Sequence, residues 1–139
     1  GLMGEQAVGQ LPGWSSIIGL QLENLISSNV SDLADHLQLG RTPIIAAAPF
    51  VQTPTKRKKG CQVDLMLLTR HATYLVEVKR RKNIDLSVIP QMQEKLRRLS
   101  LDPRRSVRTA LVYHGELDRR IEEEQFFDFV IPFGRLLSS

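Results

Sequence analysis

The first apolar positions of the chain recur at helical spacing. From Pro12 to Leu37, apolar side chains return every three or four residues, which is the period of a helix with one buried face. Proline is favoured in the first turn of a helix, and Gly40 followed by Pro43 is typical of a helix end. The pattern predicts either one long helix over this segment or two helices, the second with Ser31 as its N-cap.

Three apolar segments after this helix lack its period. Ile44–Val51 contains a proline, which is tolerated at a sheet edge, so we expect an edge strand there. Gln62–Thr69 and Thr73–Lys79 are nearly continuous apolar runs, which is typical of strands that are buried on both faces. The intervening segment 53–60 contains Pro, Gly and four consecutive bases and is predicted to be a loop.

The second half of the chain alternates between helical and extended patterns. Ser87–Leu99 has an apolar stripe at helical spacing, and Leu117–Phe126 is a charged segment that we also predict to be helical. Val107–Tyr113 and Phe127–Pro132 are predicted strands. This order of elements predicts an α/β fold in which a central mixed sheet is flanked by helices on both faces, an α/β/α sandwich.

Composition limits the class of protein. A chain of 139 residues with 42% apolar and 24% charged residues is long enough for one domain, which we expect over residues 12–139 after a leader or linker over 1–11. No apolar run reaches the roughly 18 residues that a spanning helix needs, so no membrane partner is expected. The single cysteine, Cys61, excludes an intrachain disulfide and favours a reducing compartment, the cytoplasm.

Positive charge is concentrated in the middle of the chain. Residues 41–110 hold sixteen Lys and Arg against five Asp and Glu, a net charge of +11, whereas residues 1–40 carry −4 and residues 111–139 carry −3. A surface of this kind attracts polyanions, and nucleic acid is the commonest of them. The alternative is a solvated basic face without a ligand.

Three charged residues lie inside the two continuous apolar strands: Asp64, Glu77 and Lys79. The short connection at Arg70 and His71 predicts an antiparallel hairpin, so the turn decides which of them face each other. A two-residue turn places Asp64 opposite Glu77, and a four-residue loop places it opposite Lys79. Both put the three charges on one face of the sheet, whereas a three-residue loop moves Asp64 to the other face.

Two carboxylates on one face of an apolar sheet predict a bound cation. Like charges this close resist joint ionisation unless a cation neutralises them, and Mg²⁺ binds proteins through one or two carboxylates. Lys79, roughly 7 Å along the strand from Glu77, can position a water molecule or offset charge on a phosphate. The alternative is a structural ion-pair network in which Lys79 neutralises one carboxylate and one negative charge is left over.

The pattern of Asp64, twelve residues and then Glu77-Val78-Lys79 resembles the PD-(D/E)XK nuclease superfamily, which has the restriction-endonuclease-like fold. The resemblance implies that Asp64 and Glu77 bind Mg²⁺ or Mn²⁺ with the Val78 carbonyl, and that Lys79 assists the hydrolytic water. It also implies a ligand carboxylate from the first helix and a Gln from the helix after Lys79. The usual proline before the Asp is absent, because Val63 stands there. The candidates for the two further residues are Glu23 and either Gln91, which we prefer, or Gln93.

The resemblance also implies a substrate and partners. It predicts a Mg²⁺-dependent deoxyribonuclease, an endonuclease by expectation, and the layout is similar to archaeal Holliday-junction resolvases and to nuclease-like domains fused to predicted ATPases. An attached ATPase domain and a homodimer are therefore further partners to consider. The alternative is a catalytically inactive nucleic-acid-binding or interaction module of the same fold, attached to an ATPase. The candidate nucleic-acid-binding residues are Lys56, Arg57, Lys58, Lys59, Arg80, Arg81 and Lys82.

Overall fold

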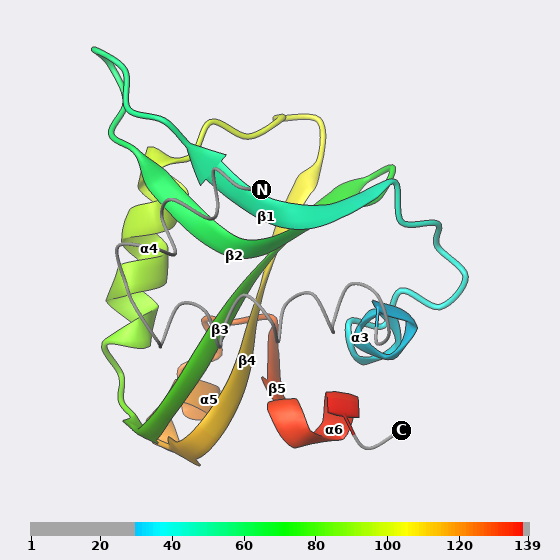
Figure 1. Cartoon of the computed structure of the whole chain (residues 1–139), viewed down its shortest axis with the longest axis vertical. Coiled ribbons are helices and arrows are strands. Elements are labelled where there is room, and N and C mark those ends of the chain that lie inside the picture. The colour runs from blue at the N-terminus through cyan, green and yellow to red at the C-terminus, as the bar shows by residue number, and fades with distance from the viewer. Residues whose placement is uncertain (1–29, 138–139) are drawn as a thin grey trace.

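The computed structural model describes residues 30–137, and its core is a five-stranded sheet in the order β1-β2-β3-β4-β5 (Figure 1). β1, β2 and β3 are antiparallel neighbours, whereas β3, β4 and β5 run parallel, so the sheet is mixed as predicted. The strands are β1 (Ala46–Gln52), β2 (Cys61–Leu68), β3 (Ala72–Ile84), β4 (Ser106–Leu117) and β5 (Phe129–Pro132).

One face of the sheet is covered by α4 (Val88–Arg98) and α5 (Arg120–Glu123). The apolar stripe of α4 includes Val88 and Met92, which are almost fully buried against this face. Burying a side chain of this size stabilises the fold by roughly 1.5–3 kcal/mol. The predicted helix over 87–99 is therefore confirmed to within one residue at each end.

The other face of the sheet is covered by α3 (Val30–His36) and α6 (Phe133–Leu137). Leu33 and Leu37 pack there with the strand residue Val76 in a second apolar core cluster. Helices on both faces of a mixed sheet confirm the predicted α/β/α sandwich, and the arrangement is consistent with the restriction-endonuclease-like fold. Of the helices between residues 30 and 137, none has the length and apolarity required to cross a bilayer.

Several predicted boundaries are wrong. The helix predicted over 117–126 is a single turn, α5, because its one buried side chain, Ile121, gives a longer helix no apolar face to bury. β4 instead extends to Leu117, paired with a β3 that continues well past Lys79. Ser31 lies within α3 and not before its first residue, and α6 follows β5 where no element was predicted.

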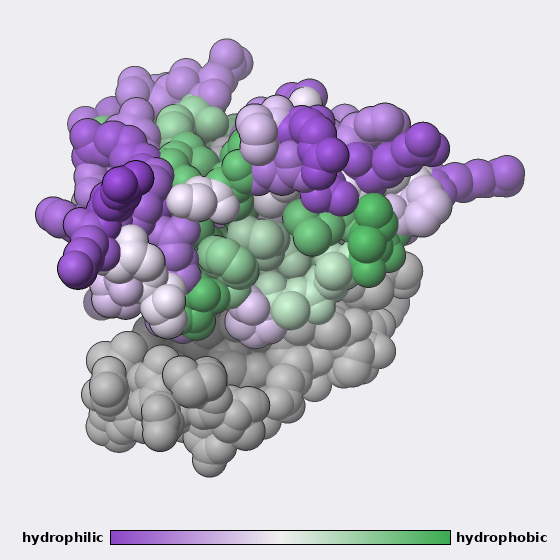
Figure 2. All heavy atoms as spheres, turned by 90° about the horizontal axis from the view of Figure 1, so that it is seen from above, coloured by the Kyte–Doolittle hydropathy of each residue, from purple (hydrophilic) through white to green (hydrophobic). Residues whose placement is uncertain are grey.

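β1 forms one edge of the sheet, as predicted, and leaves apolar side chains accessible. Val51 in this strand is 47% exposed, and Ile45 just before it is 59% exposed. Seen from above the view of Figure 1, apolar side chains form a band between hydrophilic regions (Figure 2). Pro49 lies in this edge strand without a backbone N–H to offer, which discourages pairing with another chain.

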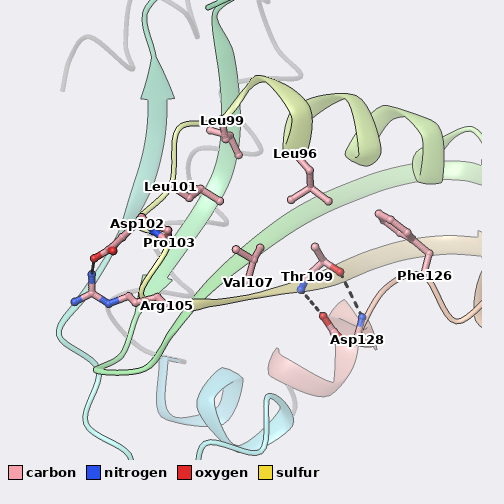
Figure 3. A pocket seen from close by; sticks show the side chains of 10 residues that line it. All are labelled: Leu96, Leu99, Leu101, Asp102, Pro103, Arg105, Val107, Thr109, Phe126 and Asp128. Atoms are coloured by element: carbon pink, nitrogen blue, oxygen red, sulfur yellow. Dashed lines mark hydrogen bonds and ion pairs between the residues drawn. The ribbon is translucent and has the colours of Figure 1, made fainter.

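A hollow of about 570 Å³ lies between the end of α4 and the first half of β4 (Figure 3). Its floor is apolar, and an ion pair between Asp102 and Arg105 lies at one end. At the other end the Asp128 carboxylate accepts a hydrogen bond from the Thr109 N–H at 2.8 Å, at the point where β5 has not yet begun to pair with β4. None of the charged residues of the β2–β3 hairpin lines this hollow.

Candidate active site

The turn between β2 and β3 has two residues, Arg70 and His71. The Thr69 N–H donates to the Ala72 carbonyl at 2.9 Å, and the Ala72 N–H donates to the Thr69 hydroxyl at 3.1 Å. The paired positions that follow run from Leu68 opposite Thr73 to Leu65 opposite Val76. Extended by one residue, this register would place Asp64 opposite Glu77. The structure therefore selects the two-residue turn and excludes the three- and four-residue loops.

A β-bulge in β2 determines how Asp64 is held. Met66 lies opposite Ala48 of β1 and Val63 lies opposite Phe50, so β2 has one extra residue at this point. As a result Val63 joins the core on the α4 side, whereas Leu65 joins the core on the opposite side. The bulge redirects the backbone immediately beside Asp64.

The Asp64 carboxylate replaces a missing backbone partner. In a regular ladder the hydrogen-bonded pairs alternate, and Val78 of β3 would bond to the backbone of Val63. Instead the Val78 N–H donates to Asp64 Oδ2 at 2.8 Å. This bond fixes one carboxylate oxygen at the point where β2 and β3 stop pairing and diverge, with α4 beside them (Figure 1). We call this point the fork.

Glu77 lies at the fork and is almost fully buried, with 5% of the residue exposed. Its Oε2 accepts a hydrogen bond from Lys95 Nζ at 2.8 Å. Its other oxygen, Oε1, is buried and has no hydrogen-bond partner in the part of the chain that the structure describes. A buried carboxylate oxygen without a partner is costly, so this atom is suited to a ligand that brings a cation or a hydrogen-bond donor.

Lys79 and Gln91 meet beside the carboxylate pair of Asp64 and Glu77. Lys79 Nζ lies 3.5 Å from Gln91 Oε1, a long hydrogen bond from β3 to α4. Both Gln91 and Gln93 are exposed, but within residues 30–137 Gln91 is the one with a hydrogen bond to Lys79, so this contact favours Gln91 as the glutamine at the fork. Lys79 is half-buried and turns to the same face as Glu77, as strand alternation predicts.

Lys95 belongs to the site and was not among the predicted residues. It lies one helical turn after Gln91 on α4, so both side chains point to the same side of the helix. This four-residue spacing was the only indication in the sequence, and it depends on knowing which side of α4 meets the sheet. With Lys95 the fork holds two carboxylates and two ammonium groups, so the predicted surplus negative charge is not present.

The environment of the fork shifts three pKa values. Burial raises the pKa of Asp64, although the hydrogen bond from Val78 and the nearby lysines oppose the shift. Burial also raises the pKa of Glu77, the charge of Asp64 raises it further, and Lys95 opposes both effects. Burial lowers the pKa of Lys79, partly offset by Glu77. All three shifts follow from charged groups placed where water is largely excluded.

Replacement of Asp64 by Asn is expected to stabilise the metal-free protein more as the pH rises. Below about pH 4 Asp64 is protonated in both the folded and unfolded states, and Asn resembles that form. Above this pH the unfolded chain loses its proton first, because the pKa is raised in the folded state, so the wild type loses stability until the pH passes that raised pKa. Urea unfolding in EDTA from pH 4 to 8 measures the difference between the two proteins.

Asp128→Asn is the matched control for this measurement, because Asp128 Oδ2 also accepts a strand N–H at 2.8 Å but lies outside the carboxylate pair. The stability difference between Asp64→Asn and the wild type should grow with pH and then level off. A difference that shrinks as the pH rises would show that the fold stabilises ionised Asp64.

The donor set of the fork fits a hard divalent cation. Mg²⁺ is held in proteins by one or two carboxylates and keeps water or substrate oxygens in its other positions. One oxygen of Asp64 accepts the Val78 N–H, which leaves its second oxygen outside that bond, and Glu77 presents Oε1 without a partner among residues 30–137. Within residues 30–137 no group of three or more His, Cys, Asp or Glu side chains forms a complete ligand set. Glu23 lies outside the described residues.

The two predicted basic segments lie at opposite ends of α4. Lys56–Lys59, which we call the basic loop, is exposed and is tied to the end of the helix by Gln52, whose Nε2 donates to the carbonyls of Lys59 and Arg98. Arg81 and Lys82 are exposed on β3 just before α4 begins, whereas Arg80 is half-buried. Both segments thus flank the fork, which lies beside the middle of α4 (Figure 1).

Comparison with solved structures found a protein of similar fold. Neither a protein-family model nor a curated protein matches the chain. A repair endonuclease from Pyrococcus abyssi matches with 20% sequence identity and a TM-score of 0.41. The match covers 75% of this chain and 44% of that protein, so the chain spans less than half of the length of its structural neighbour. Function is therefore inferred from the geometry of the fork.

Proposed function

We propose that this chain is a metal-dependent nuclease domain that hydrolyses DNA phosphodiester bonds. The observation that carries the proposal is Glu77 Oε1, a buried carboxylate oxygen without a partner in the described part of the chain, beside the second carboxylate of Asp64. A purely structural ion pair would leave no such acceptor, because unsatisfied buried polar atoms are costly. An internal position of this kind is suited to a ligand.

Each residue of the fork has a role in this proposal. Asp64 and Glu77 hold Mg²⁺ or Mn²⁺, with the Val78 carbonyl and Glu23 as the further ligands that the resemblance implies. The bound ion would activate water and stabilise the negative charge that develops on the phosphate. Lys79, whose pKa is lowered by burial, positions the attacking water, and Gln91 holds the Lys79 ammonium at 3.5 Å.

DNA is the proposed substrate because the fork lies between two basic segments. The basic loop and the exposed basic side chains of β3, Arg81 and Lys82, can contact backbone phosphates on either side of the carboxylate pair. Such contacts position a duplex or a single strand without reading its sequence. The arrangement favours cleavage within a strand, an endonuclease activity, because DNA would extend past the site in both directions.

A second function, nucleic-acid binding without catalysis, is favoured by the ion pair between Lys95 and Glu77. This pair at 2.8 Å, together with Lys79, balances the two carboxylates, so charge alone does not require a metal. A module of this kind would bind DNA through its basic segments and cut nothing. The two functions differ in whether the protein cleaves DNA when a divalent cation is added.

A cleavage assay tests the proposal directly. Single-stranded, duplex and branched DNA are incubated with the protein and Mg²⁺ or Mn²⁺, and with EDTA in a parallel set. Metal-dependent cleavage that is lost in Lys79→Ala supports the proposal. Equal cleavage by wild type and Lys79→Ala would point to a contaminating nuclease, and salt-sensitive binding without cleavage would establish the second function.

Removal of two charges from the basic loop is expected to weaken DNA binding and its dependence on salt. In the double variant Lys56→Gln with Lys58→Gln, the slope of log affinity against log salt should fall by about two, since each phosphate contact contributes about 0.9. This slope is measured by fluorescence anisotropy with a labelled duplex at salt concentrations between about 50 and 200 mM.

The double variant Arg104→Gln with Arg120→Gln is the matched control, because it also removes two charges. Both guanidiniums are exposed and already paired, with Asp102 and Asp118 respectively. This control should leave the slope unchanged. An equal loss in both double variants would mean that net charge, and not the basic loop, governs binding.

A further inference from the structure

The ammonium of Lys95 lies where a cation would serve the carboxylate pair. It donates to Glu77 Oε2 at 2.8 Å. Among the residues that the structure describes, Glu77 is the one carboxylate to which Lys95 is bonded. Lys95 is thus bonded directly to the carboxylate pair through Glu77, whereas Lys79 is hydrogen-bonded to the amide oxygen of Gln91.

The backbone at Lys95 is firmly placed. Its carbonyl accepts the Leu99 N–H at 3.0 Å, and Met92 and Leu99 on either side are buried against the sheet. The Cys61 thiol of β2 also lies 3.9 Å from this carbonyl. The side chain, in contrast, keeps 29% of its surface exposed, so its four-carbon stem has room to swing the ammonium away from Glu77.

We propose that Lys95 is the resident counter-ion of the carboxylate pair and competes with the divalent cation for Glu77, so that its ammonium leaves Oε2 when a cation binds this carboxylate. This inference rests on the proposed function and assigns Lys95 the role of a positioning residue. In the metal-free state Lys95 keeps Glu77 Oε2 in place and limits the repulsion between the two carboxylates. In the metal-bound state its ammonium is released toward solvent, at the side of the fork that DNA approaches.

Competition by Lys95 and structural support by Lys95 predict opposite changes in the affinity for the divalent cation when Lys95 is removed. An ammonium that already occupies a carboxylate oxygen weakens binding of a second cation, both by blocking that oxygen and by charge repulsion. If Lys95 instead only supported the fold, its removal would leave Glu77 less well held and would weaken metal binding. The direction of the change in affinity therefore separates the two roles.

Affinity for Mn²⁺, measured by electron paramagnetic resonance without DNA, tests the proposal. Lys95→Gln is expected to bind Mn²⁺ about tenfold more tightly than the wild type, as expected for removing one charge about 5 Å from a divalent ion in water. Lys95→Arg keeps the charge and should remain close to the wild type. Unchanged or weaker binding by Lys95→Gln would overturn the proposal.

Arg97→Gln is the matched control on the same helix. Arg97 is two residues from Lys95 and pairs with Glu94, and its side chain is 75% exposed and turned away from the fork. Arg97→Gln removes the same charge as Lys95→Gln but at a position turned away from the carboxylate pair, so the affinity for Mn²⁺ should change little. A tenfold gain in Arg97→Gln as well would reduce the effect of Lys95 to one of net charge and would count against displacement.

A measurement on the wild type covers the case in which Lys95→Gln does not fold. The rate at which an amine-acylating reagent modifies Lys95 is followed by peptide mass spectrometry, with the exposed Lys82 as the internal reference. Saturating Mg²⁺ should raise the rate at Lys95 severalfold relative to Lys82. A constant or lower relative rate would contradict the release of Lys95.

Failure of this inference and failure of the proposed function give different results. Metal-dependent cleavage by the wild type with no gain of affinity in Lys95→Gln would overturn the inference alone. Mn²⁺ binding by Lys95→Gln but not by the wild type would support the inference and show that Lys95 keeps the natural chain from acting as a nuclease. Absence of binding by both proteins would overturn both.

Discussion

Asp64→Asn is expected to lower the rate of metal-dependent DNA cleavage by about a thousandfold, equivalent to ~4 kcal/mol of transition-state stabilisation. Asn retains an oxygen that can accept the Val78 N–H, so the local backbone geometry should persist. What is lost is the negative charge that, with Glu77, holds the cation. The rate is measured under single-turnover conditions with saturating Mg²⁺.

Asp128→Asn is the control for this variant because it makes the same chemical change at the same kind of hydrogen bond. Asp128 Oδ2 accepts the Thr109 N–H at 2.8 Å, the distance that separates Asp64 Oδ2 from the Val78 nitrogen. Cleavage by Asp128→Asn should stay within about twofold of the wild type. If both variants cleave at the wild-type rate, Asp64 is not a metal ligand in this chain.

Together with the expected gain in stability of the metal-free protein, this result would show that Asp64 is retained at a cost to the fold. The buried carboxylate weakens the folded state at neutral pH and supplies the charge that the reaction needs. Active sites commonly combine these two properties. A stabilised and inactive Asp64→Asn would therefore distinguish a functional carboxylate from one that merely completes the bulge.

Gly115→Ala is expected to destabilise the protein by about 3 kcal/mol or more, the sum of overpacking and backbone strain. Gly115 has φ +136°, a conformation that L side chains rarely adopt, and a Cβ there would fall far inside contact distance of the Arg81 carbonyl oxygen. The clash is with backbone, so no side chain can move to relieve it. A fall in Tm of roughly 10 °C, followed by circular dichroism, is the expected measurement.

Gly40→Ala separates the two causes. Gly40 also has a positive φ, +58°, but nothing lies within 4 Å of a Cβ added there. Backbone strain alone should therefore lower the free energy of unfolding of Gly40→Ala, by about 1 kcal/mol. The remaining loss in Gly115→Ala then measures the close approach of β4 to β3. Equal losses in both variants would show that the approach to Arg81 carries no extra energy.

Gly115 is relevant to function because it lies where β3 and β4 shift register. The shift falls between Arg80 and Asn83 of β3, at the exposed basic residues that we propose to contact DNA. A side chain at position 115 would push this part of β3 away from the sheet. We therefore expect folded Gly115→Ala to bind DNA less tightly as well.

The architecture was predictable from apolar patterns because each pattern reflects burial within one element. Two continuous apolar strands required helices on both faces of the sheet, and the stripe of α4 gave its bounds to within a residue. The charged segment 117–126 was predicted wrongly because a segment of high helix propensity without an apolar face can form either a helix or the end of a strand. In the structure its first residue, Leu117, pairs with Ile84 as the end of β4.

The candidate site was predictable only in part. Strand alternation placed Glu77 and Lys79 on one face whatever the turn, but the partner of Asp64 depended on the turn at Arg70 and His71. The bulge beside Asp64 left no trace in the sequence, because it arises from pairing with β1, and its effect is to give Asp64 a backbone N–H to hold. Lys95 was missed because contacts between α4 and β3 join residues 18 apart in the chain.

The residues alone specified most of the strands, the helix over 87–99 and the α/β class, and they marked the charged hairpin as the candidate site, since these follow from the local order of apolar and charged side chains. Tertiary packing chose among the hairpin registers, introduced the bulge and brought the Lys95 ammonium to Glu77. These outcomes depend on how separate elements meet, and that is set by the free energy of the whole core. Packing thus decided which side chains surround the carboxylate pair, because Lys95 reaches Glu77 from a separate element, α4.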